Sequence, residues 1–131
     1  MAKHNEIGKL GEDLAVKWLT DKGYSIVSRN YLKKYGEIDI VARETDKIHF
    51  VEVKSVSYET KADMEEAVSR GTWRPEENVH FSKQQRLGRV IEVWLSENNY
   101  KGEWQIDILS VRIVPRERIA RFGMLNNVIF E

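Results

Sequence analysis

The stretch GEIDIVARETDKIHFVEVK, residues 36–54, decides the fold of this chain. Two apolar runs lie on either side of Thr45 and Asp46, which predicts two antiparallel strands, Glu37–Arg43 and Ile48–Lys54, joined by a short turn. Nearly every uncharged position in both runs is apolar, as is typical of central strands that are covered on both faces. The sequence therefore predicts a hairpin in the interior of a sheet.

Charged side chains interrupt this apolar hairpin at Asp39, Glu52 and Lys54. Ionised groups in a protein interior are costly unless other groups compensate them. Side chains alternate across a strand, so Glu37 and Asp39 share one face of the first strand and Glu52 and Lys54 share one face of the second, and both sets could face the same way. With a two-residue turn, Asp39 lies opposite Glu52 and Glu37 lies opposite Lys54. A slip of one residue would instead put the charges on opposite faces of the sheet.

Two directly opposed carboxylates have Cβ atoms about 4.5–5.5 Å apart and repel each other unless a cation or a proton lies between them. This spacing suits Asp39 and Glu52 as ligands of one divalent ion, and Mg²⁺ prefers such oxygen ligands. Lys54 could then orient an attacking water or stabilise charge on a phosphate. The alternative is that Glu52 and Lys54 form an ordinary charge ladder on an exposed face. Their apolar neighbours favour the metal site.

Helical apolar spacing flanks the hairpin on both sides. It predicts an amphipathic helix over Glu6–Asp21, in which Glu12 lies off the apolar stripe and either faces inward or is an ordinary exposed glutamate. A second helix follows a capping box at Ser82, and Lys83 and Gln84 lie at the buried edge of its first turn.

The remaining segments complete the predicted order helix, strand, strand, strand, helix, strand. They are a strand over Tyr24–Arg29, a polar connection over 55–79 that could include a helical turn in DMEEAVSR, a strand over Trp104–Val114, and a partly apolar tail. This order predicts an α/β fold with a central mixed sheet flanked by helices.

Composition limits the class of protein. The chain has 131 residues, 41% of them hydrophobic, which is enough for one domain over 1–131 with a single core. Lysine and arginine total 21, as do aspartate and glutamate, so any nucleic-acid binding must be local. The absence of cysteine excludes thiolate metal sites. No signal peptide or membrane-spanning stretch is evident, so we expect a cytoplasmic protein without a membrane partner.

The order Asp39, then Glu52, Val53 and Lys54, resembles the metal-binding signature of the PD-(D/E)XK nuclease superfamily. More closely, most of the chain is similar to the YraN-like family of small, mostly uncharacterised bacterial proteins, related in fold to Holliday junction resolvases. The segments that carry this similarity are GKLGEDLAVKWL, RNY, GEIDIVAR, HFVEVK, PEENV to KQQRL, and IDILSV.

The resemblance implies a restriction-endonuclease-like fold that hydrolyses phosphodiester bonds with Mg²⁺, for which Mn²⁺ can substitute. Asp39 and Glu52 would be the metal ligands, Lys54 the catalytic lysine, and Glu12 the helix acid that contacts the metal or its water. Lys83 or Gln84 would lie where related nucleases place a polar residue on the helix after the hairpin. Glu37 would be a further acid at the site or a partner for Lys54.

The first functional hypothesis is therefore a Mg²⁺-dependent DNA endonuclease, with branched or otherwise structured DNA among its substrates. Lys33, Lys34, Lys83, Gln84 and Arg86 are the candidate substrate-binding residues, and for Lys33 and Lys34 simple solvation is an equal alternative. The second hypothesis is a non-catalytic module that binds nucleic acid or a protein partner. An RNA-directed nuclease is a third. A homodimer would let two sites cut opposing strands, and the apolar tail could supply its interface. The separated histidines are expected to be structural.

Overall fold

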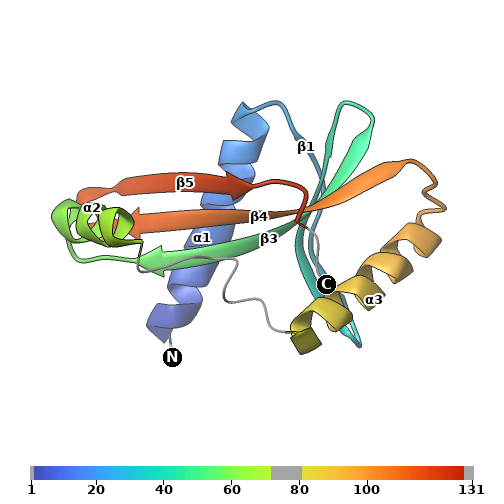
Figure 1. Cartoon of the computed structure of the whole chain (residues 1–131), viewed down its shortest axis with the longest axis horizontal. Helices are drawn as coiled ribbons and strands as arrows, with labels where there is room; N and C mark the ends of the chain where they lie inside the picture. Colours follow the sequence, from blue (N-terminus) through green and yellow to red (C-terminus); the bar gives the residue numbers. More distant parts are fainter. Residues whose placement is uncertain (1, 72–80, 129–131) are drawn as a thin grey trace.

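The computed structural model describes residues 2–71 and 81–128, with side chains for 5–71 and 85–128 (Figure 1). In chain order the elements are α1 (Ala2–Asp21), β1 (Ser25–Lys33), β2 (Gly36–Glu44), β3 (Lys47–Ser57), α2 (Lys61–Arg70), α3 (Phe81–Glu97), β4 (Glu103–Val114), a short 3-10 helix (Pro115–Glu117) and β5 (Ile119–Leu125). Within this described part of the chain, no helix has the length and apolar character needed to cross a membrane.

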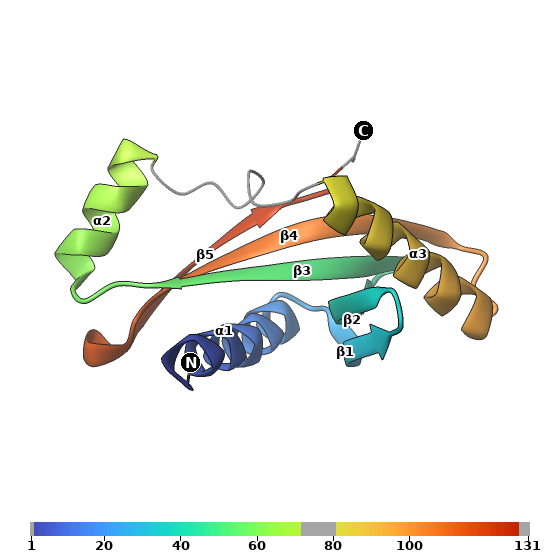
Figure 2. The same ribbon diagram turned by 90° about the horizontal axis from the view of Figure 1, so that it is seen from below.

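One sheet joins the five strands in the order β1-β2-β3-β4-β5. Strands β3 and β4 are parallel, and the other neighbours are antiparallel, so the sheet is mixed. Helix α1 lies on one side of the sheet, and α2 and α3 lie on the other (Figure 2). The predicted α/β class, with a central mixed sheet flanked by helices, is confirmed, and the arrangement is compatible with a restriction-endonuclease-like fold.

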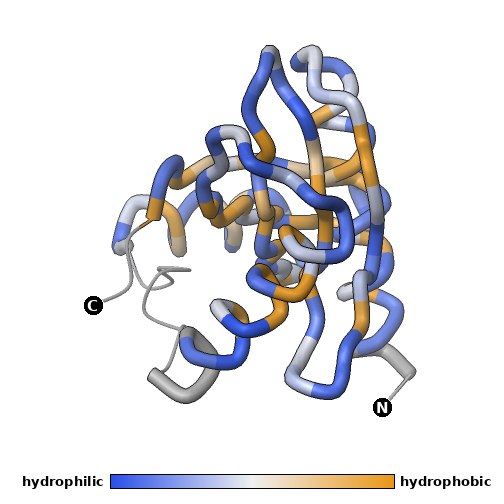
Figure 3. Tube along the Cα trace, turned by 90° about the vertical axis from the view of Figure 1, so that its right-hand side faces the viewer, coloured by the Kyte–Doolittle hydropathy of each residue, from blue (hydrophilic) through white to orange (hydrophobic). Residues whose placement is uncertain are grey.

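Each face of the sheet has its own apolar core. Ala15 and Leu19 of α1 pack with Ile40, Val51 and Leu109 on one face. On the other face, α3 packs with Phe50 and its neighbours. The members of this second cluster are Ile38, Val41, Ile48, Phe50, Leu87, Val90, Ile91 and Trp94. The hydrophobic segments accordingly concentrate in the inner strands and along parts of the helices (Figure 3). Strands β2 and β3 are covered on both sides, as their apolar runs predict.

The β1–β2 hairpin bends sharply at Asn30 and Asp39. Ile38 belongs to the α3 cluster and Ile40 to the α1 cluster, although residues two apart in a regular strand share a face. On β1, Asn30 has a left-handed backbone with φ of 52°, between residues that pair with Ile40 and Ile38. On both strands, the side chains before and after this point therefore alternate out of phase. As a result, Asp39 does not occupy a regular position in the β2–β3 ladder.

Element boundaries differ from the sequence prediction mainly at polar segments. Strand β1 continues to Lys33, into the first half of the expected NYLKKYG loop, because that segment pairs with the start of β2. The connection predicted over 55–79 begins with the end of β3 and contains a ten-residue helix, α2. Ser82 lies within helix α3, which is described from Phe81, so Ser82 is not its N-cap.

The tail adds an element that the prediction lacked. Residues Ile119–Leu125 form β5, which pairs antiparallel with β4. Its outer side is an edge of the sheet. Part of the apolar tail is therefore used within the chain, and its use in a dimer stays a prediction.

Candidate active site

Asp39 lies where the β2–β3 ladder ends. The last ladder pair is Ile40 with Val51, which is the predicted register. The predicted next pair, Asp39 opposite Glu52, does not form. Instead the backbone N–H of Val53 donates to Asp39 Oδ2 at 2.8 Å. At the bend in β2, the N–H group of Val53 thus donates to the carboxylate of Asp39 and not to a backbone carbonyl. This hydrogen bond holds the carboxylate against β3.

Three carboxylates meet at this point. Oxygens of Glu12, Glu37 and Asp39 all lie within 4.8 Å of one another. Glu12 reaches the group from α1 because the helix lies close to β3: a Cβ on Gly11 would be only 1.8 Å from Ser55 Oγ. The inward orientation of Glu12, one of two alternatives from the sequence, is therefore the one observed. We call Glu12, Glu37 and Asp39 the acidic cluster.

The environment of the acidic cluster opposes ionisation. Burial, then the charge of Glu52, raises the pKa of Asp39 to about 7, although the hydrogen bond from Val53 acts in the opposite direction. Burial, then Glu37, also raises the pKa of Glu12, against the effects of Arg29 and a hydrogen bond with Asn30. Carboxylates that crowd one another in this way are stabilised in their charged form by a cation.

Glu52 and Lys54 lie beside the cluster on β3. Glu52 is buried, and its Oε1 is 3.4 Å from Lys54 Nζ. A cavity of about 270 Å³ is lined by Glu37, Asp39, Glu52 and Arg86, with Gly36 and Leu87. The prediction that Lys54 faces Glu37 is wrong, because Glu37 belongs to the part of β2 that pairs with β1 and has left the β3 ladder. Glu37 is instead a further acid of the site.

The donor set suits a hard divalent cation. Carboxylate oxygens from α1 and β2 lie within 4.8 Å of one another, Glu52 of β3 lines the adjacent cavity, and Mg²⁺ and Mn²⁺ bind such oxygen donors. The raised pKa of Asp39 means that proton release and cation binding there are linked. The residues present therefore fit a divalent metal ion, with Asp39 and the other cluster acids as its candidate ligands.

The model of the family described as "Uncharacterised protein family UPF0102" matches residues 11–111. The chain belongs to the UPF0102 family. This confirms the similarity to the YraN-like family. The matched span includes Glu12, Asp39, Glu52 and Lys54, whereas Asn5 and Lys9 precede it.

Relatives from distant bacteria share most of the chain, and each is named only as a UPF0102 protein. The Dictyoglomus turgidum protein is 34% identical over 95% of this chain and 97% of its own length. The Nocardia farcinica protein is 38% identical over 86% of this chain and 80% of its own. The Thermotoga maritima protein is 40% identical over 82% and 85%, respectively.

The predicted substrate-binding residues of this UPF0102 protein lie at different places relative to the acidic cluster. Arg86 lines the cavity beside the acidic cluster. Lys33 Nζ is bound to Glu97 Oε2 at 2.9 Å, which ties β1 to α3. Lys34 is exposed, with its ammonium 5.4 Å from the centre of the Tyr35 ring. The side chains of Lys83 and Gln84 lie outside the described residues. The substrate role of all five stays a prediction.

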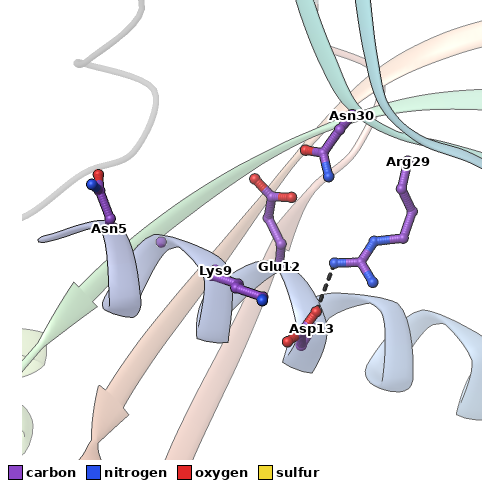
Figure 4. A pocket seen from close by; sticks show the side chains of 7 residues that line it. Asn5, Lys9, Glu12, Asp13, Arg29 and Asn30 are labelled. Carbon is purple, nitrogen blue, oxygen red and sulfur yellow. Dashed lines mark hydrogen bonds and ion pairs between the residues drawn. The ribbon is translucent and has the colours of Figure 1, made fainter. Parts of the chain in front are cut away.

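A polar groove next to the cluster contains residues that the sequence prediction missed. It has a volume of about 600 Å³ and is lined by Asn5, Gly8, Lys9, Glu12, Asp13, Arg29 and Asn30 (Figure 4). Arg29 donates to Asp13 Oδ1 at 2.7 Å, and the Glu12 carboxylate points toward Asn30. No local signal marks this groove, because it forms only when α1 packs against the bend in β1.

Proposed function

We propose that this UPF0102 protein is a Mg²⁺-dependent endonuclease that hydrolyses phosphodiester bonds in DNA. The observation that carries the proposal is the acidic cluster, with carboxylate oxygens of Glu12, Glu37 and Asp39 within 4.8 Å of one another. Glu52 and Lys54 add the remaining groups that metal-dependent phosphodiester hydrolysis needs, on the neighbouring strand.

In this proposal the metal is held by Asp39 and the other two acids of the acidic cluster, together with Glu52. When bound, a divalent ion supplies Lewis-acid polarisation of a phosphoryl group and makes a water molecule more acidic. The hydrogen bond from Val53 fixes the orientation of Asp39, so the site is built on rigid backbone. Glu52 is buried and Asp39 is half-buried, which limits their contact with bulk water, where their interaction with a cation would be weaker.

Lys54 supplies the positive charge at the site. Its ammonium group lies 3.4 Å from Glu52, and its side chain is only 14% exposed, so it is held close to the region where the phosphate would bind. A fixed ammonium stabilises charge that develops on phosphoryl oxygens, or orients the attacking water. Glu12, on a separate helix, accepts a hydrogen bond from Asn30 and could take a proton from that water.

The polar groove offers a path for the nucleic-acid backbone on one side of the cluster. Lys9 and Arg29 supply cations there, and Asn5 and Asn30 supply amide groups that can bind phosphate oxygens. Arg86 supplies a cation on the other side, at the cavity next to Glu52. Such local placement of basic residues explains how a chain with no net charge could hold a polyanion.

The test is cleavage of linear duplex, single-stranded, flapped and four-way-junction DNA, and of matched RNA, with Mg²⁺, with Mn²⁺ and with a chelator. We expect metal-dependent cleavage that is lost in Asp39→Asn and Glu52→Gln, and the preferred substrate defines the class. Glu103→Gln, an exposed carboxylate on β4, is the matched control and should cleave normally. Intact substrates with a folded wild-type protein would favour a non-catalytic nucleic-acid-binding module, and preferential cleavage of RNA would make the protein a ribonuclease.

A further inference from the structure

A second cluster of polar side chains lies at the other end of the hairpin, near the β2–β3 turn. His49 of β3 and Asp107 of β4 are both buried, and His49 Nδ1 is 2.7 Å from Asp107 Oδ2. The other oxygen of Asp107 accepts from Gln105 Nε2 at 2.7 Å and from the backbone N–H of Asn127 at 2.9 Å. Both oxygens of Asp107 thus have N–H groups as neighbours.

This arrangement fixes the orientation of the imidazole. A carboxylate can only accept hydrogen bonds, so Nδ1 of His49 carries the proton that is shared with Asp107. The lone pair of neutral His49 is then on Nε2. That atom is buried and has no hydrogen-bond partner among the described residues. The side chain of His49 is only 5% exposed, so bulk water does not satisfy Nε2.

The orphaned nitrogen lies beside a carboxylate at a cavity. His49 and Glu44 both line a cavity of about 400 Å³, together with Tyr24, Thr45, Lys47, Gln105 and Asn126. Nε2 is 3.8 Å from Glu44 Oε1. This distance is too long for a hydrogen bond. It is compatible with two ligand atoms of one ion, because Zn²⁺ binds nitrogen and oxygen at about 2.0–2.2 Å.

The groups around His49 favour a cation over an anion. Glu44 and Asp107 bring two carboxylates, whereas Lys47 directs its ammonium group to Gln105 Oε1 at 3.1 Å. The Tyr24 ring packs edge to face against the imidazole, with ring centres 5.1 Å apart. A histidine that is oriented by a carboxylate through Nδ1 and presents Nε2 is a recurring arrangement at metal centres.

We propose that His49 Nε2 and Glu44 bind a divalent transition-metal ion, of the Zn²⁺, Co²⁺ and Ni²⁺ class, at this cavity. The imidazole ligand separates this site chemically from the acidic cluster, whose oxygen donors suit Mg²⁺. The ion links the ends of β2 and β3, and through Asp107 it is connected to β4 and to the segment after β5. This inference does not depend on the proposed nuclease activity.

The experiment measures Zn²⁺ binding by titration calorimetry and Co²⁺ binding by visible absorption, in the full chain. The parent carries Asp39→Asn, His4→Gln and His80→Gln, so that neither the acidic cluster nor the other two histidines contribute. We expect one ion per chain, not displaced by millimolar Mg²⁺, and a rise in Tm when Zn²⁺ is added.

Two substitutions test the ligands separately. In His49→Asn, an amide can still donate toward Asp107 but Nε2 is removed, and Glu44→Gln removes the carboxylate. Each should weaken Zn²⁺ binding at least about tenfold, whereas Glu103→Gln should leave it unchanged. If His49→Asn does not fold, Glu44→Gln decides the question, since the Glu44 side chain is 44% exposed. Affinity within twofold of the parent in Glu44→Gln, or no one-to-one binding in the parent, would overturn the proposal.

Discussion

An aspartate lies near each end of the central hairpin, the half-buried Asp39 on β2 and the buried Asp107 on the neighbouring strand β4, and the surroundings of these two residues are opposite. Both oxygens of Asp107 face N–H donors, supplied by His49, Gln105 and the backbone of Asn127. Asp39 accepts one backbone hydrogen bond and otherwise faces three carboxylates, which help raise its pKa to about 7. A carboxylate that is surrounded by donors contributes to the fold, whereas one that is crowded by like charges needs a cation.

Near the acidic cluster, Lys54→Met should give the largest effect, which is a loss of cleavage rate. If Lys54 acts on the phosphate and not through the metal ligands, its loss should reduce cleavage by roughly 10²–10³-fold, as loss of one electrostatic donor does in other enzymes. Mn²⁺ affinity should change little. Single-turnover cleavage and Mn²⁺ titration measure the two quantities separately. A parallel loss of Mn²⁺ binding would show that Lys54 only supports Glu52, to which it is bound.

Asp107→Asn should give the largest loss of stability at the other end. An asparagine side chain has one acceptor oxygen and would turn an NH₂ group toward groups that donate to Asp107 in the wild type. We expect the free energy of unfolding to fall by about 1.5–3 kcal/mol, the usual range for hydrogen bonds to a charged group. Urea denaturation without added metal measures this change, and an unchanged midpoint would contradict the structural role of Asp107.

Asp39→Asn should change the free energy of unfolding in the opposite direction. The pKa of Asp39 is about 7 in the folded protein against 3.8 for the free side chain, so the folded state keeps a proton that the unfolded state loses. Stability of the metal-free wild type should therefore fall as pH rises from about 4 to about 7, by about 1.4 kcal/mol for each unit by which the pKa is raised.

Asp39→Asn removes this titration and should make the metal-free protein more stable than wild type at pH 8. Chemical denaturation of both proteins at pH 4, 6 and 8 measures the difference, which should be smallest at pH 4. Addition of Mg²⁺ at pH 8 should stabilise the wild type and leave the variant unchanged. A variant less stable than wild type at pH 8 without metal would contradict the repulsion within the cluster.

Arg29→Ala should have the smallest effect on stability. Its ion pair with Asp13 joins side chains that are 36% and 50% exposed, and such pairs contribute at most about 1 kcal/mol. DNA affinity should nevertheless fall. In a plot of log affinity against log salt concentration, the magnitude of the slope should decrease by about one. Arg116→Ala is the matched control, because Arg116 is in an exposed pair with Glu59 away from the groove. Equal losses in both variants would exclude the groove as the DNA path.

The sequence predicted the hairpin and its register because these depend on local patterns. Continuous apolar runs and a short turn define β2 and β3, and the observed pairing of Ile40 with Val51 follows from them. Helix α2 was anticipated only as a helical turn and strand β5 was missed, since their sequences are polar or mixed. Their stability comes from capping by Thr60 and from pairing with β4, which no local pattern reveals.

The candidate site was predictable only in part for the same reason. Asp39, Glu52 and Lys54 belong to a recognisable pattern, and Glu12 was placed by resemblance. The position of Glu37 depends on the bend at Asn30 and Asp39, and strand alternation alone cannot predict a bend. The pairing of His49 with Asp107 joins strands whose partner residues lie 58 positions apart in the chain.

Mn²⁺ binding, followed by electron paramagnetic resonance at pH 8 in wild type and Asp39→Asn, tests most directly whether the crowded carboxylates form a metal site. We expect one bound Mn²⁺ per wild-type chain, competition by Mg²⁺, weaker binding as pH falls below about 7, and no binding in the variant. Equal binding in the two proteins, or none in the folded wild type, would contradict the assignment of the acidic cluster as the metal centre.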